Sequence, residues 1–430
     1  DAKFGKLLKV LIMSFIKKTH NNLAIKTDNR PLFICIYHCY SLILSINKRS
    51  FFDRFQHEIK GEKIYQQLRM ENYTIGFYLE KLYYIPHFEP VIKEIIKRNI
   101  SYVIIIPKNR GRDELNQREE SIKYCQEKGF TYCLDEEHRE CNIMVFGNAP
   151  RHISTPFKKS ALIMHGTWGG KTVNYAPDLN DVDLRFLDGK FMEDRLLELF
   201  PEKKSIYYIS GYSKLDNYFQ LTEEDRIKFL QSCHLDINKK TILYAPTFYP
   251  SSILKMGKKF PEDFAEYNII LKPHSHLFLR KRYRRDLHRL ETWAKYPNVY
   301  LAHFNETDIL PFLNASDLMI SDMSSAVFEF AGIGKPAIVN MFLRYRLHDR
   351  LFPHKARKRL DTENFYLWEV ADTPKRYQNM VKNAQEALAG TDKNKAKREE
   401  LIHYVMGAVD GKVSPRIVDK LLELNNSIKA

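Results

Sequence analysis

The stretch "DLMISDMSSAVFEFAGIGKPAIV", residues 317–339, carries the pattern strand, turn, helix, turn, strand. Its short apolar run 318–320 is typical of a parallel strand that is buried on both faces, and residues 322–325 offer helix-capping side chains. A helix over 326–331 would end at the two glycines that follow, because Pro336 prevents its continuation before the next apolar run. The stretch therefore predicts a β-α-β unit of an open parallel sheet.

Acidic and hydroxyl side chains stand between the first strand of this unit and its helix, namely Asp322, Ser324 and Ser325. In open α/β sheets, ligands bind outside the carboxyl ends of the strands, where the free N–H groups of a helix N-terminus favour an anion. Two serine hydroxyls would add two hydrogen-bond donors, so the pattern favours a phosphate site. Plain capping of the helix is the alternative explanation, and the surrounding sequence has to decide between them.

The length and charge of the chain narrow the classes of protein to consider. With 430 residues the chain is too long for one ordinary hydrophobic core, so at least two domains are expected. Its net charge of +15 indicates an anionic partner, which is a nucleic acid, an acidic lipid or a phosphorylated substrate. The six cysteines form no Cys-x-x-Cys pair, which fits reduced thiols and a cytosolic setting.

Short apolar runs alternate with helical patterns over most of the chain. The predicted strands lie at 73–80, 101–107, 142–147 and 161–166 in a first series, and at 205–211, 241–247, 268–274, 299–302, 318–321 and 337–340 in a second. This alternation predicts an α/β fold with two doubly wound, Rossmann-type domains that face a cleft. We expect domains at 71–205 and 206–360, a basic helical extension at 1–70 and C-terminal helices at 361–430.

A second candidate motif, "MHGTWGGKT" at 164–172, follows a predicted strand. Its glycines allow the backbone to approach a ligand closely, and His165 can accept a hydroxyl proton near neutral pH. A single histidine after a strand is often structural, so the neighbouring Gly-Thr and Gly-Gly are what favours a functional role. The stretch 169–172 lacks the earlier glycine of a P-loop, and ATP hydrolysis is therefore not expected.

A third motif, "LKPHSH" at 271–276, places Lys272, His274 and His276 just after another strand. An ammonium and two imidazoles can hydrogen-bond a diphosphate or protonate a leaving phosphate. A metal site is the alternative, but no third ligand follows from the spacing. Together the three motifs describe a base in the first domain and phosphate-binding groups in the second, which suits transfer from a nucleoside-diphosphate donor.

The order and spacing of five stretches resemble those of the CDP-glycerol glycerophosphotransferase family, which includes the teichoic acid primases and polymerases. The stretches are "HGTWGGK", "ISGYSKLD", "TILYAPTF", "LKPHSH" and "DILPFLNASDLMISDMSSAVFEFAGIGKPAI". The resemblance covers about residues 160–345 and extends weakly back to residue 73. It implies a GT-B fold, with an N-terminal acceptor domain and a C-terminal nucleotide-donor domain. No cofactor and no essential metal are expected, because no Asp-x-Asp follows a strand in the cleft region and the His and Lys groups with a helix N-terminus can stabilise charge instead. The resemblance further implies transfer of glycerol phosphate or ribitol phosphate from a CDP-polyol to a hydroxyl of a glycan or lipid-linked cell-envelope acceptor, with release of CMP.

The family pattern also implies roles for individual residues. His165 would be the general base, and His274 would act at the donor phosphates. Ser324 and Ser325 would bind phosphate oxygens, and Glu329 would accept hydrogen bonds from ribose hydroxyls. The full set of predicted donor-binding residues is Gly166, Thr167, Thr247, Lys272, His276, Asp322, Ser324, Ser325 and Glu329.

The chain departs from the family pattern at three places. Gly-Tyr-Ser-Lys stands at 211–214, where Gly-Tyr-Pro-Arg is common, and Met323 precedes the two serines, where tyrosine is common. Phe248 and Tyr249 follow Ala-Pro-Thr, where an aromatic residue and an arginine are common. Two cationic positions are thus changed, which leaves the identity of the transferred group open.

Three other functions use the same features. A GT-B glycosyltransferase of capsule or lipopolysaccharide synthesis would bind a nucleotide sugar in the same cleft, and a nucleotide-sugar epimerase would need no acceptor. A basic nucleic-acid-binding protein would use "LRKRYRRDLHR" at 279–289, although this run also suits the solvated face of a helix. An acidic membrane or a polyphosphate product explains the same charge, so no nucleic-acid partner is expected.

Two apolar runs near the start of the chain, 8–16 and 31–46, are flanked by lysines and arginines. Both are shorter than the roughly 20 apolar residues that a spanning helix needs. We expect residues 1–50 to attach the protein peripherally to the anionic, cytoplasmic face of the cell membrane. The alternative is that these runs pack as helices against the body of the protein.

Overall fold

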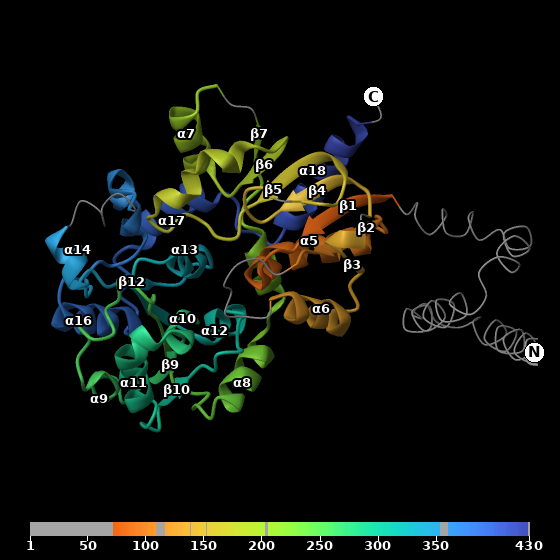
Figure 1. Ribbon diagram of the computed structural model, residues 1–430. Helices are drawn as coiled ribbons and strands as arrows, with labels where there is room; N and C mark the ends of the chain where they lie inside the picture. The colour runs from red at the N-terminus through yellow and green to blue at the C-terminus, as the bar shows by residue number, and fades with distance from the viewer. Residues whose placement is uncertain are drawn as a thin grey trace, which may run out of the picture. The chain divides into compact units, whose positions relative to one another are not determined.

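The computed structural model describes residues 72–108, 117–137, 139–151, 153–202, 205–352 and 360–428. The predicted membrane-attachment segment, residues 1–50, lies outside the described residues. Within the described ranges, parallel strands form two separate sheets (Figure 1).

The first sheet contains seven parallel strands among the described residues, in the order β3-β2-β1-β4-β5-β6-β7. The strands are β1 (Tyr73–Tyr78), β2 (Tyr102–Ile106), β3 (Tyr132–Leu134), β4 (Cys141–Phe146), β5 (Phe157–Ile163), β6 (Leu184–Leu187) and β7 (Ile206–Ile209). Every residue of β2 is buried, as expected for a strand covered on both faces. The associated helices are α5 (Ile85–Lys97), α6 (Gln117–Lys128) and α7 (Lys190–Leu199).

The second sheet contains five parallel strands in the described part of the chain, in the order β10-β9-β8-β11-β12. The strands are β8 (Thr241–Ala245), β9 (Asn268–Leu271), β10 (Val299–Leu301), β11 (Leu318–Ser321) and β12 (Ala337–Val339). The helices of this part are α8 (Glu223–Ser232), α9 (Phe260–Asp263), α10 (His276–Leu279), α11 (Arg284–Trp293), α12 (Leu310–Ala315), α13 (Ser325–Gly332), α14 (Leu347–Leu351) and α16 (Tyr377–Leu388).

The β-α-β unit predicted from the opening stretch is confirmed as β11, α13 and β12. All four residues of β11 are buried. Ser324 has extended backbone angles and caps α13, and Gly334 has a φ of +82°, a conformation in which a residue with a Cβ is strained. The turn with the two serines therefore lies at the carboxyl end of a buried parallel strand.

One predicted strand belongs to a different sheet from the one expected. The run 205–211 was predicted to open the second series, but its strand β7 pairs with β6 in the first sheet. The strands β3 and β6 are only three and four residues long, and their patterns predicted no strands. Because β7 pairs with β6, and β6 was not predicted, the sequence did not indicate that β7 belongs to the first sheet. The domain boundaries themselves stay a prediction.

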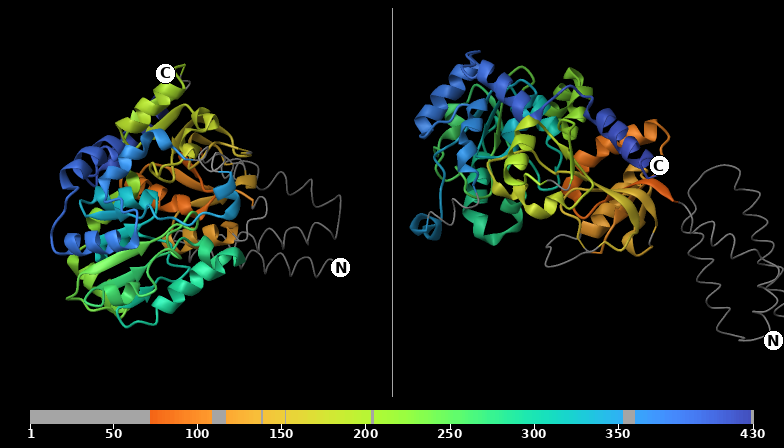
Figure 2. Two further views of the ribbon diagram at one scale, coloured as in Figure 1. Left: turned by 90° about the vertical axis from the view of Figure 1, so that its left-hand side faces the viewer. Right: turned by 90° about the horizontal axis from the view of Figure 1, so that it is seen from above.

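The end of the described chain returns to the first sheet. Helix α18 (Val413–Asn426) follows α17 (Lys395–Met406), and its residues Ile417 and Leu421 are buried in one hydrophobic cluster with β1 and α5 (Figure 2). The side-chain amide of Asn142, in β4, donates to the amide oxygen of Asn425 across 2.9 Å. The C-terminal segment therefore packs with both halves of the protein and is not a separate appendage. Here the first half is the part built around the first sheet, and the second half is the part built around the second sheet.

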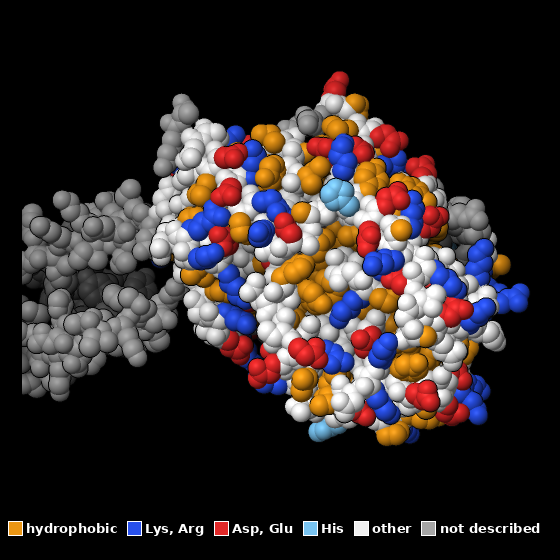
Figure 3. Space-filling model, turned by 180° about the vertical axis from the view of Figure 1, so that it is seen from behind, with side chains coloured by type: hydrophobic (Ala, Val, Ile, Leu, Met, Phe, Trp, Pro, Cys, Tyr) orange, Lys and Arg blue, Asp and Glu red, His pale blue; other side chains and the backbone are white. Residues whose placement is uncertain are grey.

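Charges of both signs are interspersed on the face turned away from the view of Figure 1 (Figure 3). The excess of lysine and arginine over acidic residues is thus not gathered on that face. Within the described ranges, no helix combines the length and the apolar character that crossing a membrane requires.

Candidate active site

His165 lies two residues beyond the end of β5, in the turn that leaves the first sheet. Its Nδ1 is 2.7 Å from the carbonyl oxygen of Gly147. A carbonyl oxygen only accepts hydrogen bonds, so Nδ1 carries the proton and Nε2 of the neutral ring is an acceptor. Burial lowers the pKa of His165, and the bond to Gly147 opposes this shift only in part. The residue is therefore a neutral base near pH 7.

The rings of Tyr83 and Tyr84 hold the imidazole of His165 in place. Their centroids lie 4.9 Å and 5.1 Å from the centroid of the imidazole. The position of Nε2 is therefore set by packing as well as by the hydrogen bond of Nδ1.

The glycine-rich turn after His165 touches the N-terminus of α13. A Cβ built on Gly169 would lie 3.1 Å from the backbone nitrogen of Ser325, which is closer than nearly all real Cβ contacts. Glycine therefore permits the backbone of the first half to approach the helix N-terminus of the second half. This contact brings together two of the three sequence motifs.

A buried aromatic cluster fixes this approach. Trp168 is fully buried and packs against Phe328 of α13 and against Trp368, with ring centroids 5.4 Å apart in both cases. Its indole N–H donates to Oδ2 of Asp361 across 2.8 Å, and the hydroxyl of Tyr175 donates to the same oxygen across 2.7 Å. The turn is thus anchored to elements of the second half on both sides of Gly169.

Glu329 lies one helical turn beyond Ser325, but its carboxylate is already occupied in this structure. The hydroxyl of Tyr212 donates to Oε1 across 2.8 Å, and the ammonium of Lys214 donates to Oε2 across 2.7 Å. Both donors follow β7 of the first sheet, so this is a second connection between the two halves. A contact between Glu329 and ribose hydroxyls stays a prediction, and it would have to use the remaining lone pairs.

His274 and Lys272 follow β9, as the third motif predicts. Nδ1 of His274 accepts a hydrogen bond from the backbone N–H of His276 across 3.2 Å, so Nε2 of the neutral ring carries the proton. The ring of His274 remains partly exposed to solvent, but the surrounding protein removes much of its hydration. This desolvation is the largest effect that lowers the pKa of His274 to about 4, and the charges of His276 and Lys171 follow it. At neutral pH it is a hydrogen-bond donor rather than a cation.

Lysines from both halves provide the positive charge of the site. Lys171, in the glycine-rich turn, acts electrostatically on His274, and Lys214 acts on Lys272. Burial lowers the pKa of Lys272, and the nearby acids Glu306 and Asp308 counteract this shift. The arrangement suits an anion held between the turn after β5, the turn after β9 and the N-terminus of α13.

Asp322 and Thr247 hold each other rather than facing open space. Asp322 is fully buried, and its two carboxylate oxygens accept from the backbone N–H groups of Thr247 and Ser252, each across 3.0 Å. Burial raises the pKa of Asp322 to about 6. The hydroxyl of Thr247 donates to the carbonyl oxygen of Pro250 across 2.7 Å. Asp322 and Thr247 thus form a clamp that fixes the loop after β8, and a contact of either residue with the CDP-polyol stays a prediction.

The two serines differ in their local bonds. Oγ of Ser324 accepts the N–H of Ala326 across 3.3 Å, whereas the hydroxyl of Ser325 makes no hydrogen bond to the part of the chain that is described. A Cβ on Gly166 would meet nothing within 4 Å, so the backbone there is open to a ligand. Thr167 is buried, and His276 begins α10. The predicted donor-binding residues thus differ in burial: Thr167, Asp322 and Glu329 are buried, and the others are partly exposed.

Several residues that shape the site carry no functional role in the sequence patterns. Lys171 stands inside a quoted motif, and its spacing from Gly169 is a signal that could have been used. Trp168, Tyr212 and Asp361 are recognisable only through their contacts, because residues nearly 200 positions apart meet at Asp361. Among the described residues, no group of three or more histidine, cysteine, aspartate or glutamate side chains is placed to hold a metal ion.

Comparison with known families and proteins gives matches over more than half of the chain. The sequence model described as CDP-Glycerol:Poly(glycerophosphate) glycerophosphotransferase matches residues 152–423. The teichoic acid poly(ribitol-phosphate) polymerase of Bacillus spizizenii is 28% identical over 201 residues, which are 43% of this chain and 28% of that protein. The teichoic acid glycerol-phosphate primase of the same organism is 27% identical over 151 residues, which are 34% of this chain and 37% of that protein. The match thus spans less than two fifths of either relative.

Solved structures with the same architecture confirm the fold. The wall teichoic acid polymerase TagF superposes with a TM-score of 0.60 at 15% identity, covering 84% of this chain and 91% of that chain. A UDP-GlcNAc 2-epimerase from Neisseria meningitidis superposes with a TM-score of 0.54 at 15% identity, covering 81% of this chain and all of that one, 100%. The predicted GT-B-like α/β fold is therefore confirmed, and at these identities the likeness concerns the fold alone.

Proposed function

Because the chain belongs to the CDP-glycerol:poly(glycerophosphate) glycerophosphotransferase family, we propose that it transfers a polyol phosphate from a CDP-polyol to a hydroxyl of a teichoic-acid acceptor. One observation supports the proposal beyond family membership: the glycine-rich turn that follows His165 packs closely against the helix N-terminus at Ser325, where a Cβ added to Gly169 would crowd the backbone. This packing would let a base of the first half and an anion site of the second half act on the same substrates, as a transfer between two substrates requires.

In the proposed reaction, Nε2 of His165 accepts the proton of the acceptor hydroxyl. The acceptor oxygen attacks the phosphorus that bears the polyol, and a new P–O bond forms. The bond from this phosphorus to the bridging oxygen breaks, so that CMP leaves with the electron pair of that bond. Since Nδ1 of His165 donates to Gly147, Nε2 is the nitrogen free to take the proton.

The negative charge of the donor diphosphate is compensated by groups from both halves. Ser324, Ser325 and the first N–H groups of α13 would bind phosphate oxygens. Nε2–H of His274 would donate to the departing phosphate, because Nδ1 is engaged with the N–H of His276. Lys171 would add positive charge that acts on His274, and burial lowers the pKa of this lysine. The chain's own groups thus cover proton transfer and charge stabilisation.

The acceptor and the place of action belong to the same proposal. Both relatives named above act, by their names, in teichoic acid synthesis, one with ribitol phosphate and one with glycerol phosphate. We propose a lipid-linked or glycan acceptor at the cytoplasmic face of the membrane, for which the net charge of +15 would favour peripheral attachment. Family membership favours phosphotransfer over a nucleotide-sugar reaction and over nucleic-acid binding.

The proposed reaction is tested by the masses of its products. The purified protein would be incubated with an isolated envelope acceptor and with CDP-glycerol, CDP-ribitol or a nucleotide sugar. We expect the acceptor to gain one or more polyol-phosphate units, with one CMP released per unit. Addition of a sugar, or turnover of a nucleotide sugar without an acceptor, would contradict the proposal and identify a glycosyltransferase or an epimerase.

The two serines should separate donor binding from helix capping. Ser325→Ala removes a hydroxyl with no bond to the described residues, so we expect CDP affinity to fall by about 1.5–3 kcal/mol without a change in stability. Ser324→Ala should weaken CDP binding similarly and should also lower the free energy of unfolding by about 0.5–2 kcal/mol, because the cap of α13 is lost. Isothermal titration with CDP and chemical denaturation measure the two effects.

Ser324→Gly is the matched control for the cap. Glycine at an N-cap costs only a few tenths of a kcal/mol, so this variant should keep stability close to that of the wild type while CDP binding stays weak. Unchanged CDP affinity in all three variants would show that the serines only cap the helix.

A further inference from the structure

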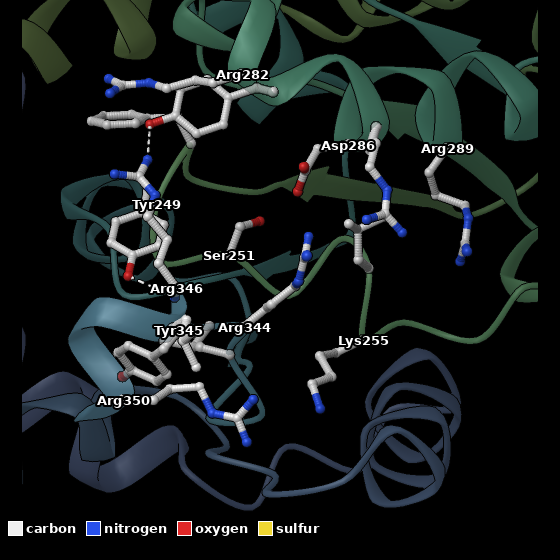
Figure 4. A pocket seen from close by; sticks show the side chains of 16 residues that line it. Tyr249, Ser251, Lys255, Arg282, Asp286, Arg289, Arg344, Tyr345, Arg346 and Arg350 are labelled. Carbon is white, nitrogen blue, oxygen red and sulfur yellow. Dashed lines mark hydrogen bonds between the residues drawn. The ribbon is translucent and has the colours of Figure 1, made fainter. Parts of the chain in front are cut away.

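A cavity of about 750 Å³ opens beside the candidate active site, and seven of its 16 lining residues are lysine or arginine. Its walls come from the segments that follow β8, β9 and β12. Figure 4 shows side chains entering from opposite sides, from the region of α11 and from the segment that leads into α14. The lining arginines among the described residues are Arg282, Arg285, Arg289, Arg344, Arg346 and Arg350.

The positive charge of this cavity is left largely uncompensated by the protein. The ion pairs inside the two segments join His288 to Glu291 and His348 to Asp349, and no arginine of the cavity lies within ion-pair distance of a carboxylate in the described ranges. One acid, Asp286, lines the cavity, and burial raises its pKa while two of the arginines oppose this shift. Besides the arginines, Lys255 adds a further cation. An anionic ligand would supply the missing charge.

Two features indicate that the cavity is prepared for hydrogen bonding to such a ligand. Nη1 of Arg289 is buried and makes no hydrogen bond to the described residues. Arg346 is fixed, because its guanidinium lies 4.1 Å over the ring of Tyr249 and donates to the hydroxyl of Tyr283 across 2.9 Å. The same contact covers a face of Tyr249, which removes a surface on which a nucleobase would stack.

The cavity borders the candidate active site at Phe248. This residue lines the cavity, and its ring centroid lies 4.8 Å from that of His274 and 4.9 Å from that of His276. A ligand that fills the cavity would therefore contact Phe248, which packs against His274, a residue that is proposed to act at the donor diphosphate.

We infer that this arginine-lined cavity is an acceptor subsite that binds a poly(polyol phosphate) chain through at least two successive phosphodiester groups. The inference rests on the proposed function, and it assigns a place to an acceptor class that the family description already names. That place lies within residues 206–360, the part of the chain that was expected to bind the donor. Each unit of a poly(polyol phosphate) chain carries one negative charge, and guanidinium groups match phosphate oxygens with paired hydrogen bonds. The volume of the cavity falls in the range of ligand sites. The basic run 279–289 thus acquires a function, since three of its arginines line the cavity.

The test compares two variants that each remove two positive charges. Arg285→Gln with Arg350→Gln removes one cation from each side of the cavity. Lys281→Gln with Arg284→Gln removes two exposed neighbours that do not line it. The probe is a fluorescent tetramer of glycerol phosphate, measured by anisotropy in the wild type and in both variants. We expect at least about tenfold weaker binding in the cavity variant and less than about twofold change in the control, with CDP affinity unchanged in both.

Unchanged tetramer binding in the cavity variant, or an equal loss in the control variant, would overturn the inference. Two further probes are a single-stranded oligonucleotide with four phosphates and phosphatidylglycerol vesicles. If the cavity variant binds the oligonucleotide or the vesicles more weakly than the wild type but binds the tetramer equally well, the inference is overturned in favour of that other ligand.

The inference and the proposed function fail in different ways. If the cavity variant transfers polyol phosphate to a tetramer and to a single unit as efficiently as the wild type does, the subsite is wrong and the function stands. If the wild type binds the tetramer through the arginines but transfers nothing from CDP-glycerol or CDP-ribitol, the function is wrong and the polyanion site stands.

Discussion

His165→Ala should reduce the rate of polyol-phosphate transfer by about 10²–10⁴-fold, because it removes the general base. The neutral imidazole, with its proton on Nδ1, presents Nε2 as the acceptor, and no other ring nitrogen of the first half is so placed within the described residues. His87 is fully sequestered, since burial holds its pKa well below the ordinary value and its ring packs against Tyr212. Turnover would be measured as CMP release under saturating donor.

His165→Asn serves as the control for structural damage, because an asparagine amide can still donate to the carbonyl oxygen of Gly147. Both variants should lose activity, while the asparagine variant should unfold at the same denaturant concentration as the wild type. CDP affinity should also stay unchanged in both. Near-normal turnover in His165→Asn would remove His165 from the mechanism.

The pH profile gives an independent check on the same residue. Burial lowers the pKa of His165, so the proton-free base persists below pH 6.5 and kcat/KM should fall only at more acid pH. His274, with a pKa of about 4, should contribute a fall near pH 4, where its protonation would break the bond that Nδ1 accepts from the N–H of His276. The fall due to His165 should be absent in the residual activity of His165→Asn, and the fall near pH 4 should remain.

The sequence predicts most of the fold because parallel strands that are buried on both faces consist of short, recognisable apolar runs. The β-α-β unit 318–339 is the clearest case, since its strand, its cap and its glycines all agree with one structure. The strands β3 and β6 are three and four residues long, too short for a period to stand out from their surroundings. The place of β7 depends on its neighbour β6, and strand order is a property of the sheet rather than of any one run.

The chemistry of the candidate site is predicted less completely than the fold. A histidine after a strand and serines at a helix start carry local signals, and the structure packs the glycine-rich turn that follows the histidine against the start of the serine helix. Asp322 has the same kind of signal, yet it faces inward, because its carboxylate satisfies two backbone N–H groups of a loop 70 and 75 residues away. Which of two polar neighbours faces a ligand depends on contacts that are distant in sequence.

The hydrogen bonds to the carboxylate of Glu329 also come from residues that are distant in sequence, so the sequence could not predict them. The spacing of Glu329 from Ser325 places it on the accessible side of α13 by helical periodicity alone. In the structure, residues 212 and 214 of the first half reach that side and cover it. The lysine at 214, which the sequence marks only as a departure from the arginine that is common there, is therefore a structural partner of α13 as well as a charge near Lys272.

Lys214→Met should destabilise the protein by about 3–5 kcal/mol, because it leaves the carboxylate of Glu329 buried without its cation. The side chains of Lys214 and Glu329 are only 13% and 4% exposed, so water cannot replace the lost partner. Methionine keeps the apolar length of the lysine stem, which limits the effect of a cavity. Chemical denaturation, with the free energy of unfolding extrapolated to water, is the measurement.

Two companion variants separate the buried charge from general damage at this position. Lys214→Arg keeps the cation and should stay within about 1 kcal/mol of the wild type. In Lys214→Met with Glu329→Gln, no buried charge remains, and the amide oxygen can still accept the hydroxyl of Tyr212, so most of the lost stability should return. If Lys214→Met alone is as stable as the wild type, the ion pair does not hold the two halves together. If the double variant is no more stable than Lys214→Met, the loss comes from packing and not from the unpaired carboxylate.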